Sequence, residues 1–390
     1  MNFTERFQNT EGVHPQEREL NTPTPQQPHP ELQAHKTAEE LLSLFQGESL
    51  EELLELDHYE SSLSLWEEVL SGPTRSFLSA PGKSLRRDFV ELGWRLASTL
   101  SQGTRTPCPP ALPHLIELLH SGSLIVDDIE DQSLTRRGQP CLHRQIGLAP
   151  ALNIGNWLYF VSAQMLERLE CPLSTRATLY ARLNRVMLRC HQGQALDVSC
   201  QVTSYARAKL PKLTSLSTRL KTGVLVGFAL QLGGLAQDLS AESTAMFYRF
   251  GERMGLALQM YDDLSGFLSE AKWHKGREDM SRQRLTWVWA WLAQEPTLTD
   301  HEFSELMSEL KALNTLGEGT HQPQTQGEHS AWEARAVALR DRCRPLLSSA
   351  EQKIKAEVQS ALEELAVALQ NDEAYLIATR AVARLQRSYL

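Results

Sequence analysis

The spacing of apolar residues predicts helices along most of the chain. From about Glu31 to Leu70, leucines recur at helical intervals among many glutamates, which predicts amphipathic helices with an acidic outer face. From Ala149 to about Arg207 the pattern is again helical, without alternation long enough to suggest a sheet. The longest apolar run, Gly223 to Ala236, contains Gln231 and is too short to span a bilayer. We therefore predict an all-α protein with no membrane span.

Two polar segments interrupt this pattern. Residues 1–30 are rich in Pro, Gln, Thr and Glu, a composition that cannot bury enough surface to fold, so we expect a disordered leader. Residues 314–330 (NTLGEGTHQPQTQGEHS) are polar and turn-rich, which predicts a flexible loop. The rest of residues 31–390 is predicted to form a single α-helical domain.

Composition narrows the class of protein. A chain of 390 residues with 41% hydrophobic content can bury a large core, and a net charge of −9 argues against nucleic-acid binding. The cysteines are far apart and form no CxxC pair, which argues against zinc and against a disulfide framework. Reduced thiols, together with an N-terminus that lacks the apolar core of a signal peptide, predict a cytoplasmic protein.

The most informative stretch runs from His120 to Pro140 (HSGSLIVDDIEDQSLTRRGQP). On a helix, Asp127 and Asp131 share one face because they are four residues apart, and Asp128 lies beside them. Clustered carboxylates repel one another, and a hard divalent cation such as Mg²⁺ would offset that cost. An isolated DDxxD is a weak signal, since most such runs are solvated helix faces.

A double arginine makes the signal specific. Arg136, Arg137 and Gly138 follow the acidic cluster, and arginine side chains suit phosphate oxygens. Together these residues describe a site for a metal-bound diphosphate. The combination resembles the first aspartate-rich motif, DDxxD-x4-RRGxP, of the trans-isoprenyl diphosphate synthases, the farnesyl and geranylgeranyl diphosphate synthase family. The resemblance implies a helical bundle around a central elongated cavity, usually in a homodimer.

A second acidic element, Gln259 to Glu270, resembles the QxxDDxxD pattern of the same family, with Gly266 in place of the last aspartate. Glu270 lies one helical turn beyond Gly266, and we expect it to replace the missing carboxylate in part. The pattern then approaches the NDxxSxxxE motif of class I terpene cyclases. The resemblance implies three Mg²⁺ ions, with the following metal ligands: Asp127, Asp128, Asp131, Asp262, Asp263 and Glu270. The residues expected to carry catalysis are Asp127, Asp128, Asp131, Arg136, Lys221 and Asp262.

Basic residues elsewhere match the family's two diphosphate pockets. The resemblance assigns four residues to isopentenyl diphosphate: Lys83, Arg86, His120 and Arg137. It assigns six to the allylic diphosphate, which would be dimethylallyl, geranyl or farnesyl diphosphate: Arg136, Lys221, Thr222, Gln259, Lys275 and Arg284. Read without the resemblance, the stretch at 80–87 is a basic helix start, a lone histidine is usually structural, and Lys221-Thr222 is a simple helix boundary.

Small residues before the first motif bear on product length. Gly122 and Ser123 lie five and four positions before Asp127, where bulky aromatics in the family stop chain growth at fifteen carbons. The growing prenyl chain would lie in the central cavity. Leu119, one helical turn before Ser123, would form the next layer at the closed end of that cavity. We therefore predict geranylgeranyl diphosphate or a longer product.

Three functions remain open at this point. The first is a prenyltransferase that joins an allylic diphosphate to isopentenyl diphosphate. The second is a terpene cyclase on the same scaffold, which Lys83, Arg86 and Arg137 argue against because a cyclase holds no second diphosphate. The third is a non-catalytic regulatory subunit of a prenyl synthase, which the intact first motif argues against.

Overall fold

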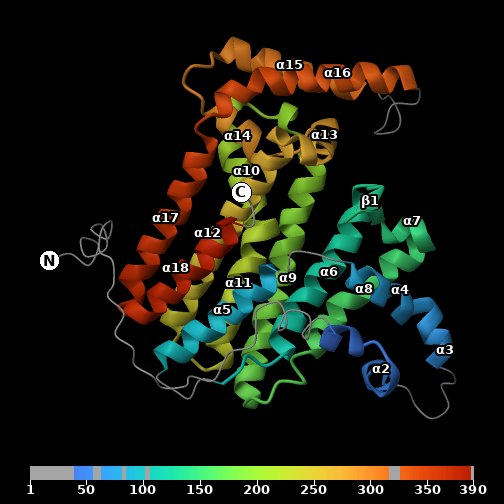
Figure 1. Ribbon diagram of the computed structural model, residues 1–390, viewed down its shortest axis with the longest axis vertical. Helices are drawn as coiled ribbons and strands as arrows, with labels where there is room; N and C mark the ends of the chain where they lie inside the picture. The colour runs from blue at the N-terminus through green and yellow to red at the C-terminus, as the bar shows by residue number, and fades with distance from the viewer. Residues whose placement is uncertain (1–38, 56–62, 81–84, 102–105, 316–325, 388–390) are drawn as a thin grey trace, which may run out of the picture. The chain divides into compact units, whose positions relative to one another are not determined.

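The computed structural model describes residues 39–55, 63–80, 85–101, 106–315 and 326–387 (Figure 1). The chain divides into two compact units, each assembled from two stretches. Unit 1 comprises residues up to Ser84 and Pro109–Leu169, and unit 2 comprises Leu85–Cys108 and Glu170–Leu390. The described residues are helical apart from loops and one short hairpin, which confirms the all-α prediction. The predicted leader, residues 1–30, lies outside the described residues.

In unit 1, the helix that carries the DDxxD motif packs against a second long helix. The elements of this unit are α2 (Gly47–Leu54), α3 (Leu63–Trp66), η1 (Glu67–Ser71), α4 (Gly72–Ser79), α6 (Ala111–Glu130), β1 (Thr135–Arg136), β2 (Gln139–Pro140), α7 (Leu142–Ile146) and α8 (Leu148–Gln164). Glycines let α6 and α8 approach closely, because a Cβ atom on Gly122 would lie 2.7 Å from the carbonyl oxygen of Gly155. This contact fixes the height of the aspartates on α6 relative to α8.

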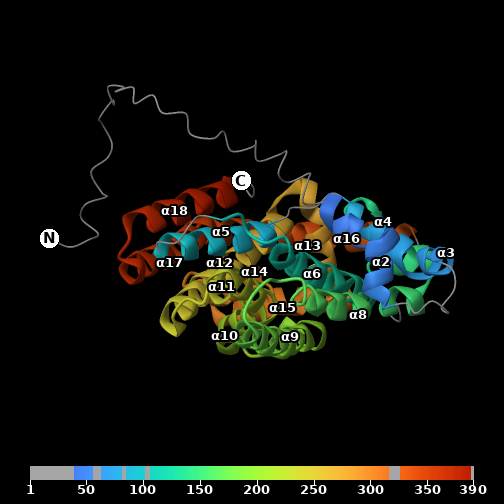
Figure 2. The same ribbon diagram turned by 90° about the horizontal axis from the view of Figure 1, so that it is seen from below.

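Unit 2 contains the remaining helices. They are α5 (Leu85–Leu100), α9 (Leu173–Ser199), η2 (Val202–Ser204), η3 (Arg207–Lys209), α10 (Leu210–Thr218), η4 (Arg219–Gly223), α11 (Val224–Ala236), α12 (Ala241–Leu268), η5 (Glu270–Lys272), α13 (Trp273–Ser281), α14 (Trp287–Ala293), α15 (Asp300–Thr315), α16 (Gln326–Cys343), η6 (Arg344–Leu347), α17 (Ala350–Leu369) and α18 (Asp372–Arg387). Within this unit, α11 and α12 form a central pair, with α5, α17 and α18 on one side and α9 and α10 on the other (Figure 2). The nearly all-apolar α11 is buried along most of its length, as expected for a helix covered on several sides.

A turn of π-helix, η4, joins α10 to α11 without interrupting the helical course. Such a turn inserts an extra residue and often occurs at functional sites. Here it carries Lys221 and Thr222. A Cβ atom on Gly193 of α9 would lie 2.2 Å from the backbone nitrogen of Lys221, so α9 is in backbone contact with this turn.

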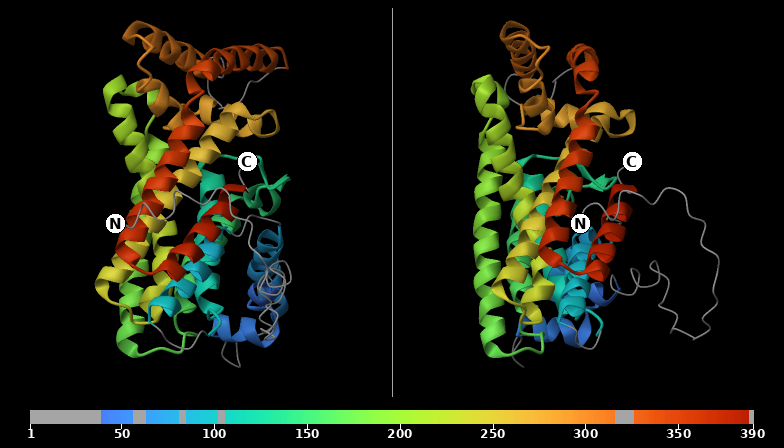
Figure 3. Two further views of the ribbon diagram at one scale, coloured as in Figure 1. Left: turned by 60° about the vertical axis from the view of Figure 1, so that its left-hand side comes forward. Right: turned by 90° about the vertical axis from the view of Figure 1, so that its left-hand side faces the viewer.

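The α15–α16 pair lies at one end of the long helices of unit 2 (Figure 3). Both ends of the segment predicted as a flexible loop, residues 314–330, are helical, because α15 extends to Thr315 and α16 begins at Gln326. The Trp332 indole nitrogen donates to the carbonyl of Leu313 at 3.1 Å, and this packing extends both helices into the polar segment. Residues 316–325 lie outside the described part of the chain.

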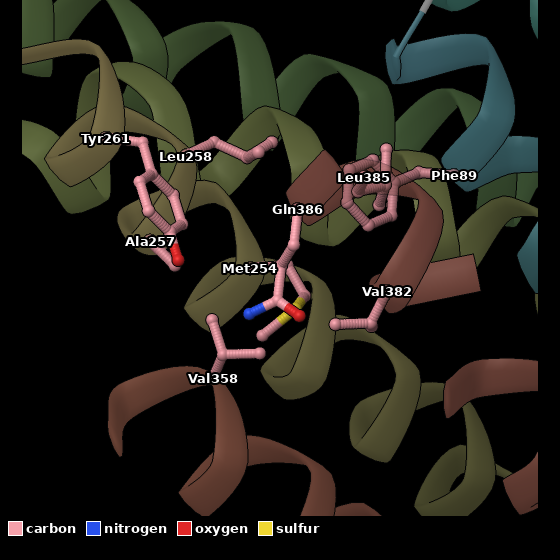
Figure 4. Close-up of a pocket in the computed structure, with 9 residues that line it drawn as sticks. All are labelled: Phe89, Met254, Ala257, Leu258, Tyr261, Val358, Val382, Leu385 and Gln386. Carbon is pink, nitrogen blue, oxygen red and sulfur yellow. The ribbon is translucent and has the colours of Figure 1, made fainter. Parts of the chain in front are cut away.

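Four helices of unit 2 enclose an apolar pocket. Its lining includes Phe89 of α5, Met254 and Tyr261 of α12, and Val382 of α18 (Figure 4). Tyr261 immediately precedes the aspartates of the second motif, so the wall of this pocket is continuous with the helix that carries them. Among the described helices, none is long and apolar enough to cross a membrane.

Candidate active site

The first cluster, which we call the DDxxD half-site, consists of Asp127, Asp128, Asp131, Arg136 and Arg137. The backbone N–H of Asp131 donates to the carbonyl of Asp127 at 2.8 Å, so the two residues are one helical turn apart and share a face. Both side chains are partly exposed, whereas Asp128 is 1% exposed. The first and third aspartates are therefore the more exposed carboxylates of the motif.

Asp128 is held by Arg136. The Arg136 Nε donates to both carboxylate oxygens of Asp128 at 3.0 and 3.2 Å, and its Nη2 also contacts this carboxylate. The same Nη2 lies 3.7 Å from Asp127. The Asp128 oxygens are thus engaged in a buried ion pair, and the role of Asp128 as a metal ligand stays a prediction. Asp128 also fixes Arg136 beside Asp127.

The double arginine forms a tight hairpin. Thr135 pairs with Pro140, and Arg136 pairs with Gln139, across a two-residue turn. Both turn residues have positive φ, +53° at Arg137 and +78° at Gly138, as the two-residue turns that match the twist of a hairpin require. Arg137 is exposed and donates from Nη1 to the carbonyl of Ala80 at 2.8 Å. Of the two arginines, Arg136 thus pairs with Asp128, and Arg137 lies at the surface.

A second cluster lies on α12 and α13, and we call Gln259, Asp262, Asp263, Lys275 and Asp279 the second half-site. Asp263 is buried and accepts from Gln259 Nε2 at 2.8 Å and from the backbone N–H of Trp287 at 2.9 Å. Burial raises the pKa of Asp263 to about 6, against the opposing effects of Lys275 and these two hydrogen bonds. Each carboxylate oxygen of Asp263 accepts a hydrogen bond from the protein, and its role as a metal ligand stays a prediction. Asp262 is the half-exposed carboxylate of the pair.

Lys275 and Asp279 occupy one face of α13. Loss of hydration alone would lower the pKa of Lys275, but the carboxylates of Asp262, Asp279 and Asp263 outweigh it and raise the pKa. Burial raises the pKa of Asp279 to about 7, and Lys275 opposes that shift. The lysine stem also covers Gly266: a Cβ atom there would lie 3.4 Å from Lys275 Cδ. Lys275 thus lies where the family's third aspartate would project.

Asp197 of α9 links two of the predicted cations. It accepts from Lys221 Nζ at 2.6 Å and lies 3.5 Å from Nη1 of Arg284, which also donates to its backbone carbonyl. Asp197 is not among the residues that the sequence analysis assigned to the site, because a lone aspartate in a helix is as easily structural as functional. Thr222, in turn, donates to Gln259 Oε1 at 3.2 Å, so a polar chain continues from Thr222 through Gln259 to Asp263. The structure therefore brings together the predicted allylic residues of unit 2.

Glu270 lies beyond the end of helix α12. Helix α12 ends at Leu268, and Ser269 has extended backbone angles of φ −84° and ψ 127°. The helical phase is therefore lost before Glu270, which the prediction of a shared face did not allow for. The Glu270 side chain is 75% exposed and lies 3.0 Å from Arg340 Nη1 and 3.8 Å from Arg344 Nη2. Glu270 is thus an ion-pair partner of α16 and η6, and its role as a metal ligand stays a prediction.

The remaining predicted residues have mixed outcomes. Lys83 lies outside the described residues. Arg86 is on the first turn of α5 in unit 2, while His120 is on α6 in unit 1. Gly122, predicted at a tunnel floor, instead faces α8, where a Cβ atom would also lie 3.1 Å from Leu158 Cβ, so we assign it to helix packing. Ser123 is only partly buried and Leu119 is buried, and their roles in chain length stay predictions.

The carboxylates fit magnesium that arrives with a diphosphate. Within the described residues, no group of three or more His, Cys, Asp or Glu is close enough to hold a metal ion by itself. Mg²⁺ commonly takes one or two carboxylates and completes its coordination with phosphate oxygens and water. The pair Asp127 and Asp131, and the single half-exposed Asp262, are donors of that kind.

Comparisons with known proteins identify the family of this chain. A family model described as polyprenyl synthetase matches residues 67–313, so the chain belongs to the polyprenyl synthetase family. A geranylgeranyl pyrophosphate synthase of Apiospora sacchari is 29% identical over 205 residues, which cover 52% of this chain and 56% of that protein. A terpene synthase of Matsumurasca onukii is 30% identical over 203 residues, which cover 50% and 60%. The chain spans little more than half the length of such curated relatives.

Solved structures show the fold. A farnesyl diphosphate synthase from T. brucei matches with a TM-score of 0.69 at 16% identity, covering 91% of this chain and 98% of that one. A geranylgeranyl pyrophosphate synthetase from Pyrococcus horikoshii matches with a TM-score of 0.64 at 19% identity, covering 90% and 94%. The all-α fold of the prenyl synthases is therefore the fold of this chain.

Proposed function

We propose that this protein is a magnesium-dependent prenyltransferase that joins an allylic diphosphate to isopentenyl diphosphate. The observation that carries the proposal is the DDxxD half-site: Asp127 and Asp131 share a helix face, with Arg136 fixed beside them by Asp128. The second half-site adds cations, Lys221 and Lys275, among partly exposed carboxylates. The names of the curated relatives support geranylgeranyl diphosphate as the product.

Each group has a defined task in this reaction. Asp127 and Asp131 would hold Mg²⁺ in the DDxxD half-site, Asp262 would hold it in the second half-site, and these ions would supply positive charge to a leaving diphosphate. Lys221, Lys275 and Arg284 add fixed positive charge for the same leaving group. Arg86, His120 and Arg137, with Lys83, would bind isopentenyl diphosphate, whose double bond attacks the allylic carbon. The released diphosphate accepts the proton, so no protein base is required.

Product analysis tests the proposal. Purified protein is incubated with Mg²⁺, farnesyl diphosphate and labelled isopentenyl diphosphate, and label is expected in a product of at least twenty carbons. A terpene cyclase would instead convert an allylic diphosphate to hydrocarbon without isopentenyl diphosphate. Gly266 in the second motif and the terpene synthase of Matsumurasca onukii favour this second candidate. A protein that is inactive by itself but stimulates an added prenyl synthase would instead be a regulatory subunit.

We propose a homodimer in which α9 supplies the interface. The exposed face of this helix includes Leu188, 62% exposed, and Val198, 42% exposed, with alanines at 177, 181 and 195. Water-exposed apolar stripes of this kind are typical of association surfaces. Leu188→Glu is expected to convert the dimer to monomer in analytical ultracentrifugation. Val367→Glu on α17, where the valine is 63% exposed, is the matched control and should leave the dimer intact.

The thiols support the proposed cytoplasmic location. The cysteines carry free thiols, three of them with strongly raised pKa values because they are buried: Cys108, Cys190 and Cys343. Such thiols persist in a reducing compartment. Fractionation of the native host and detection of the protein in the soluble cytoplasmic fraction would test this assignment.

A further inference from the structure

Helix α16 makes contacts that the half-sites described above do not account for. Glu333 accepts a hydrogen bond from Trp273 Nε1 at 2.8 Å and another from Arg277 Nη1 at 2.9 Å. Trp273 and Arg277 are four residues apart in α13, so they share one face of that helix. Glu333 also lies beyond residue 313, where the match to the family model ends. The Glu333 carboxylate of α16 thus contacts two residues on the same face of α13.

Arg340 strengthens the same attachment about two turns further along α16. Its guanidinium lies over the Trp273 ring, 4.6 Å from the centroid, and its Nη1 lies 3.0 Å from the Glu270 carboxylate. Arg340 is 5% exposed, so its charge is largely withdrawn from water. Leaving a buried cation without its partners costs free energy, so the contacts of Arg340 favour one orientation of α13. We call Glu333 and Arg340 the α16 brace.

The other side of α13 carries the second half-site. Lys275 and Asp279 are each two residues from a braced position, which on an α-helix corresponds to a rotation of about 200°. Helix α13 contains nine residues, too few for a stable isolated helix, so packing sets its orientation. Gly276 brings the helix against α12, since a Cβ atom there would lie 2.5 Å from the carbonyl of Gly266. Rotation of α13 is therefore limited by α12 on one side and by the brace on the other.

We propose that the α16 brace positions Lys275 for the diphosphate. Glu333 and Arg340 hold one face of α13, and the opposite face then keeps the Lys275 ammonium beside Asp262 and Asp263. Loosening the brace lets the short helix turn and moves the ammonium away from the ligand. Both brace residues are positioning residues that act through Lys275. This inference rests on the proposed function, in which Lys275 binds the diphosphate.

The first test measures α13 directly in the full-length protein. Arg340→Met keeps an unbranched stem over Trp273 but removes the charge, and Glu333→Gln keeps an acceptor for Trp273 but removes the ion pair with Arg277. Arg335→Met, at an exposed arginine of the same helix, is the control. Hydrogen–deuterium exchange without ligand should be faster over residues 270–281 in both brace variants. It should match wild type in Arg335→Met and over α17 in every variant.

The second test measures the effect on Lys275. Calorimetry with inorganic pyrophosphate and MgCl₂ should show binding weakened roughly tenfold in Arg340→Met, the scale of one displaced charge-assisted contact. In a Lys275→Ala background, Arg340→Met should cause no further loss, because the brace acts through that lysine. Equal losses in both backgrounds, or unchanged exchange over residues 270–281, would overturn the proposal.

The two measurements separate this inference from the proposed function. Wild-type protein that binds no magnesium pyrophosphate would contradict the diphosphate chemistry. The exchange experiment contains no ligand, so it decides on its own whether α16 holds α13. Unchanged exchange would reject the brace even where pyrophosphate binds normally.

Discussion

Arg136 Nε donates to both carboxylate oxygens of Asp128, at 3.0 and 3.2 Å, while Asp128 is 1% exposed. The two acidic neighbours in the motif therefore have different tasks. Asp128→Asn is expected to reduce the free energy of unfolding by about 1.5–3 kcal/mol, the usual contribution of a hydrogen bond to a charged group. Chemical denaturation measures the change. Asp127→Asn, at the neighbouring partly exposed position, is the control and should be close to wild type in stability.

Asp127 is expected to matter for turnover instead. Asp127→Ala should reduce kcat by about 10²–10³-fold, the scale of losing one charge-stabilising contact in a transition state. Circular dichroism should be little changed, because the side chain is partly exposed and not part of the core. Near-normal turnover by this folded variant would show that this helix face does not carry the chemistry.

Arg86 tests the second diphosphate. If this residue binds isopentenyl diphosphate, Arg86→Ala should raise the KM of that substrate far more than the KM of the allylic one. Arg95→Ala, at an exposed arginine on the same helix, should alter neither. Parallel changes in both KM values would indicate that the first turn of α5 has a structural role.

Ser123 and Gly122 are expected to respond differently to a bulky side chain. Ser123→Phe should shorten the product toward fifteen carbons, as measured by chromatography of the dephosphorylated products. Gly122→Phe should instead destabilise the protein, by about 1–3 kcal/mol or more, because the new side chain would push α6 away from the backbone of α8. If the Ser123→Phe enzyme makes a product of unchanged chain length, this face of α6 does not determine product length.

Gly266 tests the degenerate motif. In Gly266→Asp the new Cβ meets the Lys275 stem at ordinary contact distance, so the variant should fold. Its carboxylate would compete with the diphosphate for the Lys275 ammonium, and the KM of the allylic substrate should rise. Gly266→Ala supplies the Cβ without the charge and should behave like wild type. An unchanged KM in Gly266→Asp would indicate that the Lys275 ammonium does not contact the allylic diphosphate.

Local pattern was enough to predict the shared face of Asp127 and Asp131, because four-residue spacing on a helix leaves little freedom. It could not predict that Arg136 would form an ion pair with Asp128 rather than with a phosphate, since either anion can pair with the guanidinium. It also did not predict the ion pairs of Glu270 with α16 and η6, because α12 ends at Leu268 and no glycine or proline follows to signal the end. Glu333 was beyond reach, because its partners in α13 are 56 and 60 residues away in the chain.

The packing of α5 on α11 has a consequence for biosynthesis. A Cβ atom on Gly93 would lie 2.0 Å from the carbonyl of Leu230, so the two helices touch backbone to backbone. Yet α5 ends at Leu100 and α11 begins only at Val224. At roughly 5–20 residues per second, the ribosome needs on the order of ten seconds to deliver the partner helix. Throughout that time the nascent chain carries an apolar surface with nothing to cover it, which is the kind of segment that chaperones bind.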